Sequence, residues 1–225
     1  MHLQTIQENV KRIQETLSKG NPFGEKVTLV AATKMQSVES INAAITAGVD
    51  AVAENKAQEF RDKTEFLLPC QQHFIGHLQT NKVKYLVGKV SLFHSCDRYE
   101  LAEEIARLSI KRGVVSDVLV QINIGSEISK GGFALEDGMA AYETIRKMDG
   151  LRVKGFMAML PNSDDQEMLI GLVKKMRALF EDAKAQDANI EHLSMGMSGD
   201  WQLCVEHGSN MIRVGSTIFG ARQYV

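Results

Sequence analysis

Short apolar runs recur along the whole chain at similar intervals, and polar segments separate them. Several runs are apolar at successive positions, which is typical of strands buried on both faces of a parallel sheet. The runs begin at Val27, Ala51, Gln72, Val90, Asp117, Leu151, His192 and Met211. They predict a β-strand at each of these places.

Helical periodicity fills the segments between the predicted strands, over residues 38–47, 57–67, 82–87, 98–111, 136–148, 165–185 and 201–207. A further amphipathic helix precedes the first strand, with Leu3, Ile6, Val10, Ile13 and Leu17 at helical spacing. The alternation predicts an α/β fold, a (β/α)8 TIM barrel formed by a single domain over residues 1–225, with an extra N-terminal helix. An open doubly wound sheet has the same alternation, because periodicity does not reveal the order of strands in a sheet.

Composition narrows the classes of partner. The 225 residues are 44% hydrophobic and 24% charged, with a formal net charge of −2. This balance gives no electrostatic basis for binding nucleic acid or an anionic membrane surface. The sequence contains no signal peptide and no apolar run of transmembrane length, so we expect a cytoplasmic protein.

Cysteine and histidine residues suggest neither disulfides nor a metal. Cys70, Cys96 and Cys204 are far apart and form no CxxC motif, which indicates a reducing compartment. His94 and Cys96 alternate on one strand, but no further ligands follow at a suitable spacing. No metal site is predicted.

Lys34 is the first candidate for chemistry, because binding sites in barrels lie at the carboxyl ends of the strands. It follows the apolar run VTLVAAT, and the first carboxylate after it is Glu39. Partial desolvation would lower the pKa of this amine and let it attack an aldehyde. Judged alone, Lys34 also fits a solvated lysine at the start of a loop.

Asn55 and His77 follow the second and third predicted strands. The amide of Asn55 offers both a donor and an acceptor to a bound ring, and it fits equally well as the N-cap of the next helix. His77 is placed to face the barrel mouth, although a packed, hydrogen-bonded histidine is the more common case.

Small residues dominate the ends of the last two strands. Ser198-Gly199 and Gly215-Ser216 lie where barrels bind phosphate through backbone N–H groups and hydroxyls. Relief of crowding where the barrel closes explains one such pair, but two pairs on adjacent strands favour an anion site. Arg213 shares a strand face with Gly215 and needs an acceptor if it is buried. That acceptor is either a ligand or a carboxylate such as Glu206.

These segments together resemble the pyridoxal phosphate homeostasis protein family over essentially the whole chain. The resemblance is carried by VAATK ending at Lys34, AEN with Gln58-Glu59, HFIGHLQTNK from His73, FMAM from Phe156, LSMGMSGDW from Leu193 and IRVGSTIFGAR from Ile212. Lys56-Ala57 and Gly199 depart from the pattern, and the first pair changes the wall near the cofactor ring.

The resemblance implies a barrel like that of alanine racemase, with pyridoxal 5′-phosphate (PLP) held as a Schiff base on Lys34. It implies that Asn55 contacts the cofactor, that Arg213 faces the pyridine nitrogen, and that Ser198, Gly215 and Ser216 hold the phosphate. An arginine there keeps the ring nitrogen unprotonated, which makes the cofactor a poor electron sink. The implied role is non-catalytic, namely buffering or delivering PLP in vitamin B6 homeostasis. We further expect a monomer, with PLP-dependent apoenzymes as recipients of the cofactor.

A PLP-dependent amino-acid racemase of the alanine racemase type is the main alternative. Racemisation needs a base on each face of the cofactor, and in barrel racemases the second base is a tyrosine of another domain. Here the chain ends at Tyr224-Val225, which leaves no room for that domain, and Tyr85, Tyr99 and Tyr142 fall in predicted helices. A third possibility is a barrel that binds a phosphorylated metabolite and leaves Lys34 without a role.

Overall fold

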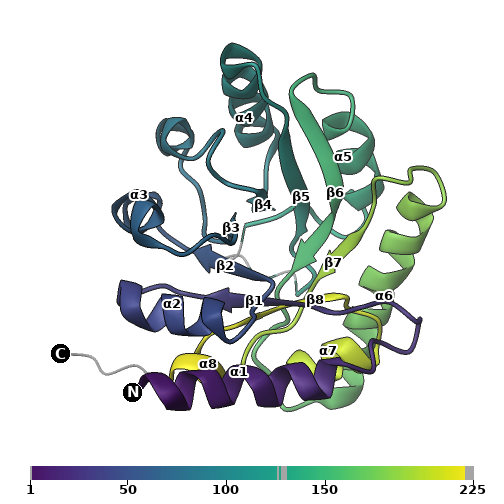
Figure 1. The fold of residues 1–225 in the computed structure, drawn as a ribbon. Helices are drawn as coiled ribbons and strands as arrows, with labels where there is room; N and C mark the ends of the chain where they lie inside the picture. The colour runs from purple at the N-terminus through teal and green to yellow at the C-terminus, as the bar shows by residue number, and fades with distance from the viewer. Residues whose placement is uncertain (1, 126, 128–130, 221–225) are drawn as a thin grey trace.

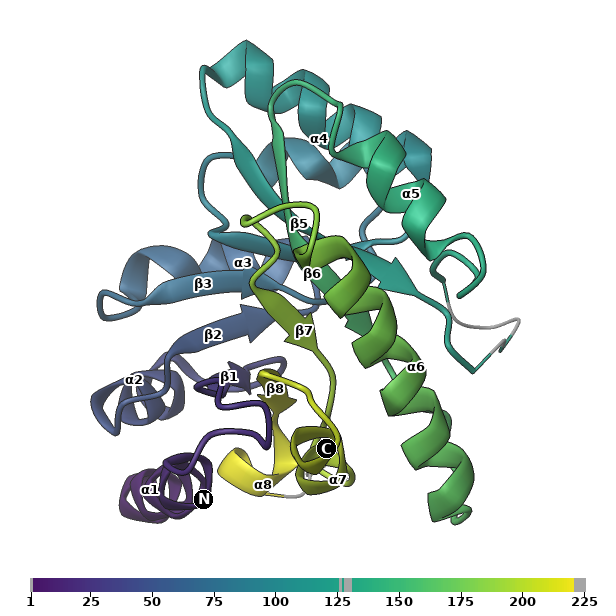
Figure 2. The same ribbon diagram turned by 90° about the vertical axis from the view of Figure 1, so that its right-hand side faces the viewer.

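The strands form a closed parallel barrel in sequence order. The computed structural model describes residues 2–125, 127 and 131–220. Within them each strand pairs with the next, and β8 pairs back onto β1, with the helices outside (Figures 1 and 2). This confirms the (β/α)8 barrel and excludes the open sheet. The strands are β1 (Thr28–Ala32), β2 (Ala51–Glu54), β3 (Gln71–Phe74), β4 (Leu92–Cys96), β5 (Ser116–Ile122), β6 (Leu151–Ala158), β7 (His192–Ser194) and β8 (Met211–Val214).

The helices follow the predicted order with local differences. They are α1 (Leu3–Leu17), α2 (Val38–Thr46), α3 (Ala57–Lys63), α4 (Tyr99–Arg112), α5 (Gly138–Ile145), α6 (Gln166–Lys184), α7 (Trp201–Glu206) and α8 (Ser216–Phe219). The predicted helix 57–67 continues past Lys63 only as a 3₁₀ turn, and 82–87 belongs to a 3₁₀ segment, Thr80–Tyr85. In the second segment Thr80 and Asn81 favour turns over α-helical hydrogen bonds, and 3₁₀ turns are common both at the ends of α-helices and as connectors. In the described part of the chain, no helix has the length and apolar character needed to cross a membrane.

Apolar side chains pack in two regions: between the strands and the surrounding helices, and inside the barrel. Between strands and helices the packing includes large buried residues such as Phe60, Phe93 and Phe156. Inside the barrel a separate cluster contains Val30, Ala51, Ala53, Leu92, Leu119, Met157 and Met211. Because this interior is packed, a bound ligand has to lie at an end of the barrel, and sites in this fold lie at the carboxyl end.

The predicted N-terminal helix is present and covers the β1–β8 side of the barrel. Ile6, Val10 and Ile13 of α1 are buried, and they belong to one apolar cluster with residues of α2 and α8 (Figure 1). The Asn9 side chain donates to the Ile218 carbonyl at 3.0 Å. This helix therefore supports the seam that closes the barrel.

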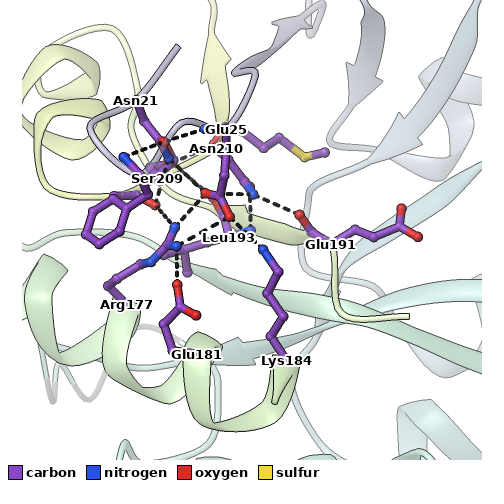
Figure 3. Close-up of polar contacts among 12 residues, drawn as sticks. Asn21, Glu25, Arg177, Glu181, Lys184, Glu191, Leu193, Ser209 and Asn210 are labelled. Atoms are coloured by element: carbon purple, nitrogen blue, oxygen red, sulfur yellow. Dashed lines mark hydrogen bonds and ion pairs between the residues drawn. The ribbon is translucent and has the colours of Figure 1, made fainter. Parts of the chain in front are cut away.

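A partly buried ion network ties the segment before β1 to α6. Arg177 and Lys184 of α6 both reach Glu25, with Nη1···Oε2 and Nζ···Oε1 distances of 2.6 and 2.7 Å (Figure 3). Asn21 also donates to Glu25, at 2.9 Å. Burial alone would raise the pKa of Glu25, but hydrogen bonds from Arg177, Lys184 and Asn21 outweigh it and lower that pKa to about 2.

We expect this network to make stability depend on acid pH. Because the pKa of Glu25 is lower in the folded chain than its ordinary 4.5, the ionised carboxylate contributes roughly 2 kcal/mol to the free energy of unfolding. That contribution is complete above about pH 4.5 and is lost as the pH falls toward 2. Urea unfolding should show Glu25→Gln much less stable than the wild type at pH 6, with a smaller difference at pH 3 that nearly disappears as the pH reaches 2. An equal difference at both pH values would contradict the assignment.

Candidate functional site

Lys34 lies just beyond the end of β1, between the strands that carry the other candidates. β1 pairs with β2 on one side and with β8 on the other. Val30 of β1 faces the barrel interior, and Lys34 follows in a turn directly after the strand, at the carboxyl end of the barrel. Its side chain is half-buried, and Met35 follows with a φ of 62° and an exposed side chain. A methionine with a left-handed backbone conformation is rare. Such conformations occur where the chain turns sharply, often at a functional site.

Two carboxylates flank the segment that carries Lys34, although neither is near it in sequence. Glu54 accepts from the Thr33 hydroxyl at 2.8 Å, and Glu59 accepts from the Met35 amide at 2.8 Å. Lys63 Nζ bridges both carboxylates at 2.9 and 2.8 Å. Burial raises the pKa of Glu54, against the hydrogen bond from Lys63. Glu54, Glu59 and Lys63 thus form a clamp that fixes the backbone on each side of Lys34.

Breaking the clamp should destabilise the protein. The side chains of Lys63 and Glu54 are only 15% and 6% exposed, so Lys63→Met would leave a buried carboxylate without its cation. We expect a loss of about 2 kcal/mol in the free energy of unfolding, measured in urea. Lys26→Met is the matched control, because Lys26 also pairs with a carboxylate, that of Asp50, but its side chain is 82% exposed. Removing this exposed ion pair should change the free energy of unfolding little. Equal effects of the two variants would contradict this reading.

Asn55 is not a helix cap. The N-cap of α3 is Lys56 and makes no side-chain cap hydrogen bond, so the N-cap interpretation is wrong. Asn55 Oδ1 is buried and has no hydrogen-bond partner among the described residues. An unsatisfied buried acceptor costs free energy, and a bound ligand with a donor would satisfy it.

Ser198, Gly215 and Thr217 come together after β7 and β8 in a group that we call the cradle. The Ser198 hydroxyl oxygen accepts from the backbone amides of Gly215 and Thr217 at 3.2 and 3.4 Å. Two amides aimed at one oxygen are the geometry that holds a phosphate oxygen. Ser216 lies between them with an exposed side chain, and a Cβ on Gly199 would meet no atom within 4 Å. The cradle therefore has open space around it.

Arg213 lies deeper in the barrel and is not paired with Glu206. Its Nη1 donates to the carbonyl and the hydroxyl of Ser194 at 2.7 and 2.6 Å, and Nη2 donates to the Ala158 carbonyl at 3.1 Å. No carboxylate makes an ion pair with it among the described residues, so the structural-pair alternative is wrong. Burial lowers the pKa of Arg213 to about 10, so the guanidinium stays charged at neutral pH. A buried cation held only by neutral groups fits a site that receives an anionic or electron-rich ligand.

A cavity of about 220 Å³ opens beside Asn55, on the side away from the cradle. Its basic lining residues are Lys56, Arg61, His77 and Lys82. His77 is 66% exposed and pairs with Asp97 at 2.9 Å, so it belongs to this cavity wall. The positive lining increases the local concentration of anions near the mouth. Among the described residues, no group of His, Cys, Asp or Glu is arranged to hold a metal ion.

The structure also shows residues that the sequence analysis missed. Thr217 supplies the second amide of the cradle, and Ser194 holds Arg213. Glu54 and Lys63 fix the segment around Lys34. A buried carboxylate at the end of an apolar strand and the i,i+4 spacing of Glu59 and Lys63 were the available signals for the clamp.

Fold and site together define a closed (β/α)8 barrel with a half-buried lysine and a group of small polar residues at its mouth. The family model for the alanine racemase N-terminal domain matches residues 1–223. The chain is 37% identical over 218 residues to the pyridoxal phosphate homeostasis protein of Aquifex aeolicus, covering 96% of each. It therefore belongs to the alanine racemase N-terminal domain family and, within it, to the pyridoxal phosphate homeostasis proteins.

Solved structures agree with this placement. A protein from Bifidobacterium adolescentis aligns with a TM-score of 0.91 at 30% identity, covering 96% of this chain and 95% of that one. PipY of Synechococcus elongatus, in a structure with PLP bound, aligns with a TM-score of 0.81 at 28% identity, covering 94% and 100%.

Proposed function

We propose that this chain binds PLP at the carboxyl end of the barrel, holds it as a Schiff base on Lys34 and serves vitamin B6 homeostasis. The observation that carries the proposal is the contact between Ser198 and Gly215, because Gly215 follows β8, the strand that pairs with the strand of Lys34. A phosphate there and an aldehyde at the amine are the two ends of one PLP molecule. The PLP-bound structure of PipY supports the same ligand class.

Each candidate residue has a distinct part in binding. Ser198, Gly215 and Ser216 hold the phosphate through hydroxyls and amides, and Thr217 adds a further amide. Asn55 uses its unsatisfied Oδ1 toward the ring substituents. Arg213 faces the ring nitrogen, and because a guanidinium keeps its protons, that nitrogen stays unprotonated.

The covalent step balances without a further reagent. The neutral amine of Lys34 forms a C=N bond to the aldehyde carbon of PLP, and the aldehyde oxygen leaves as water with the two amine protons. The reverse reaction, with water entering, releases the cofactor. A reversible bond of this kind suits buffering and delivery, and Lys34 is its only protein-side participant.

The proposed role is non-catalytic. The relatives with whole-chain similarity are named homeostasis proteins, and an unprotonated ring nitrogen weakens the cofactor as an electron sink. We propose that residues 1–225 act as one PLP-binding domain, as a cytoplasmic monomer, with PLP-dependent apoenzymes as recipients and neither nucleic acid nor membrane as a partner. The alternative is a PLP-dependent amino-acid racemase, and activity measurements distinguish it from the non-catalytic role.

Two measurements test the proposed function. Added PLP should produce an imine absorption band, and the loaded protein should activate a PLP-dependent apoenzyme in the presence of a scavenger of free PLP. Alanine should racemise no faster with the loaded protein than with free PLP. Racemisation far above that of free PLP would establish the enzyme instead, and absence of an absorption change would favour a barrel for another phosphorylated ligand.

A further inference from the structure

A chain of polar side chains crosses the otherwise apolar barrel interior. It begins at Arg213, whose Nη1 donates to Ser194 Oγ at 2.6 Å. Ser194 Oγ lies 3.1 Å from His94 Nδ1, and His94 Nε2 lies 3.0 Å from His73 Nδ1. These residues come from β8, β7, β4 and β3, so the chain spans the barrel.

All members of this chain are buried. Arg213 and His73 are 4% and 6% exposed, and Ser194 and His94 are fully enclosed. His73 also lines a hollow of about 360 Å³, formed by the first residues of several strands at the amino end of the barrel. Each buried polar group costs free energy unless it is hydrogen-bonded, so a chain of this length is costly unless every link is made.

The donors and acceptors can be ordered along the chain. A guanidinium only donates, so Ser194 Oγ accepts from Arg213. In the arrangement tested below, this hydroxyl directs its own hydrogen to Nδ1 of His94. His94 then carries its proton on Nε2 and donates to Nδ1 of His73, which in turn is protonated on Nε2. Burial, together with His192, lowers the pKa of His73 to about 3. Burial, together with His73 and Arg213, holds the pKa of His94 well below 6.5. Both rings are therefore neutral at physiological pH.

We propose that Ser194 and His94 are positioning residues, which fix the orientation of the Arg213 guanidinium toward the ring nitrogen of the bound cofactor. The inference rests on the proposed function. Arg213 has no carboxylate to orient it among the described residues, and two of its three hydrogen bonds go to backbone carbonyls. Within the described part of the chain, the Ser194 hydroxyl is the one side-chain group that accepts a hydrogen bond from Arg213, and His94 determines which way that hydroxyl points.

The test compares Ser194→Ala with Ser209→Ala. Ser209 is equally buried, and its hydroxyl contacts the Leu193 and Met195 carbonyls rather than Arg213. We expect Ser194→Ala to release PLP on the order of tenfold faster, because one hydrogen bond to a charged group is lost. Its bound-cofactor absorption should also change with pH, because a displaced guanidinium lets the ring nitrogen take a proton. Ser209→Ala should keep the wild-type release rate and absorption even if it unfolds more easily.

Histidine ring NMR gives a readout that does not depend on stability. In protein labelled with ¹⁵N-histidine, His73 and His94 should both be neutral Nε2–H tautomers. PLP should shift the His94 Nδ1 resonance in the wild type and leave it unchanged in Ser194→Ala. The inference is overturned if His94 carries its proton on Nδ1, or if Ser194→Ala matches the wild type in release and absorption. If the wild type takes up no PLP, the proposed function has failed, while the tautomers still report on the chain.

Discussion

Lys34→Ala is expected to abolish covalent PLP capture. Wild-type protein incubated with PLP and reduced with borohydride should gain the mass of one phosphopyridoxyl group, mapped to the peptide that contains Lys34. The alanine variant has no amine at this position, so the intact mass should stay unchanged and the imine absorption band should be absent. Loss of the covalent link should weaken apparent PLP affinity roughly 100-fold, leaving the noncovalent contacts of the cradle, Asn55 and Arg213.

Neighbouring lysines provide the control for this experiment. Lys56 and Lys82 line the basic cavity beside Asn55 and are exposed, so Lys56→Ala and Lys82→Ala should retain one adduct on Lys34. Circular dichroism would establish that Lys34→Ala is folded, which we expect because its side chain is not in the apolar core. A full adduct on Lys34→Ala, mapped to another lysine, would contradict the proposed attachment site.

The fold followed from the sequence because its signal is local and repeated. Every strand of the barrel was anticipated by an apolar run, since burial on both faces leaves few polar positions. Closure was not readable in the same way, because it depends on pairing between the first and last strands. That pairing, with Val30 opposite Arg213, joins residues that are far apart in the sequence.

The candidate site was predictable only in part, for a related reason. Strand ends identify which residues can reach the mouth, and this placed Ser198 and Gly215 in one region, where the structure joins them directly. What each residue contacts depends on neighbours from other strands. Arg213 is therefore held by Ser194 instead of Glu206, and Asn55 is not a cap.

The polar chain illustrates the limit most clearly. His94 and Ser194 are 100 positions apart in the sequence, yet their side chains are in contact. Periodicity shows only that both lie on strands. Their polarity inside an apolar barrel becomes informative once the topology brings β4 and β7 face to face.

Gly76→Ala is expected to disturb both the fold and the site. Gly76 follows β3 and packs against the backbone of Asn55, so a Cβ would lie 2.0 Å from the Asn55 carbonyl oxygen. Backbone atoms cannot move aside as a flexible side chain does, so β2 and β3 must separate at their carboxyl ends. We expect a loss of at least about 3 kcal/mol in the free energy of unfolding, measured in urea. PLP affinity should fall as well, because Asn55 is displaced.

Gly171→Ala introduces the same side chain but is expected to raise the free energy of unfolding. Gly171 lies within α6, and a Cβ there would meet no atom within 4 Å. Alanine should therefore stabilise the helix by up to about 1 kcal/mol and leave PLP binding unchanged. If Gly76→Ala kept wild-type stability and affinity, the close approach of Gly76 to Asn55 would not exist in solution. The proposal that Asn55 is held in place by its neighbouring strand would then be wrong.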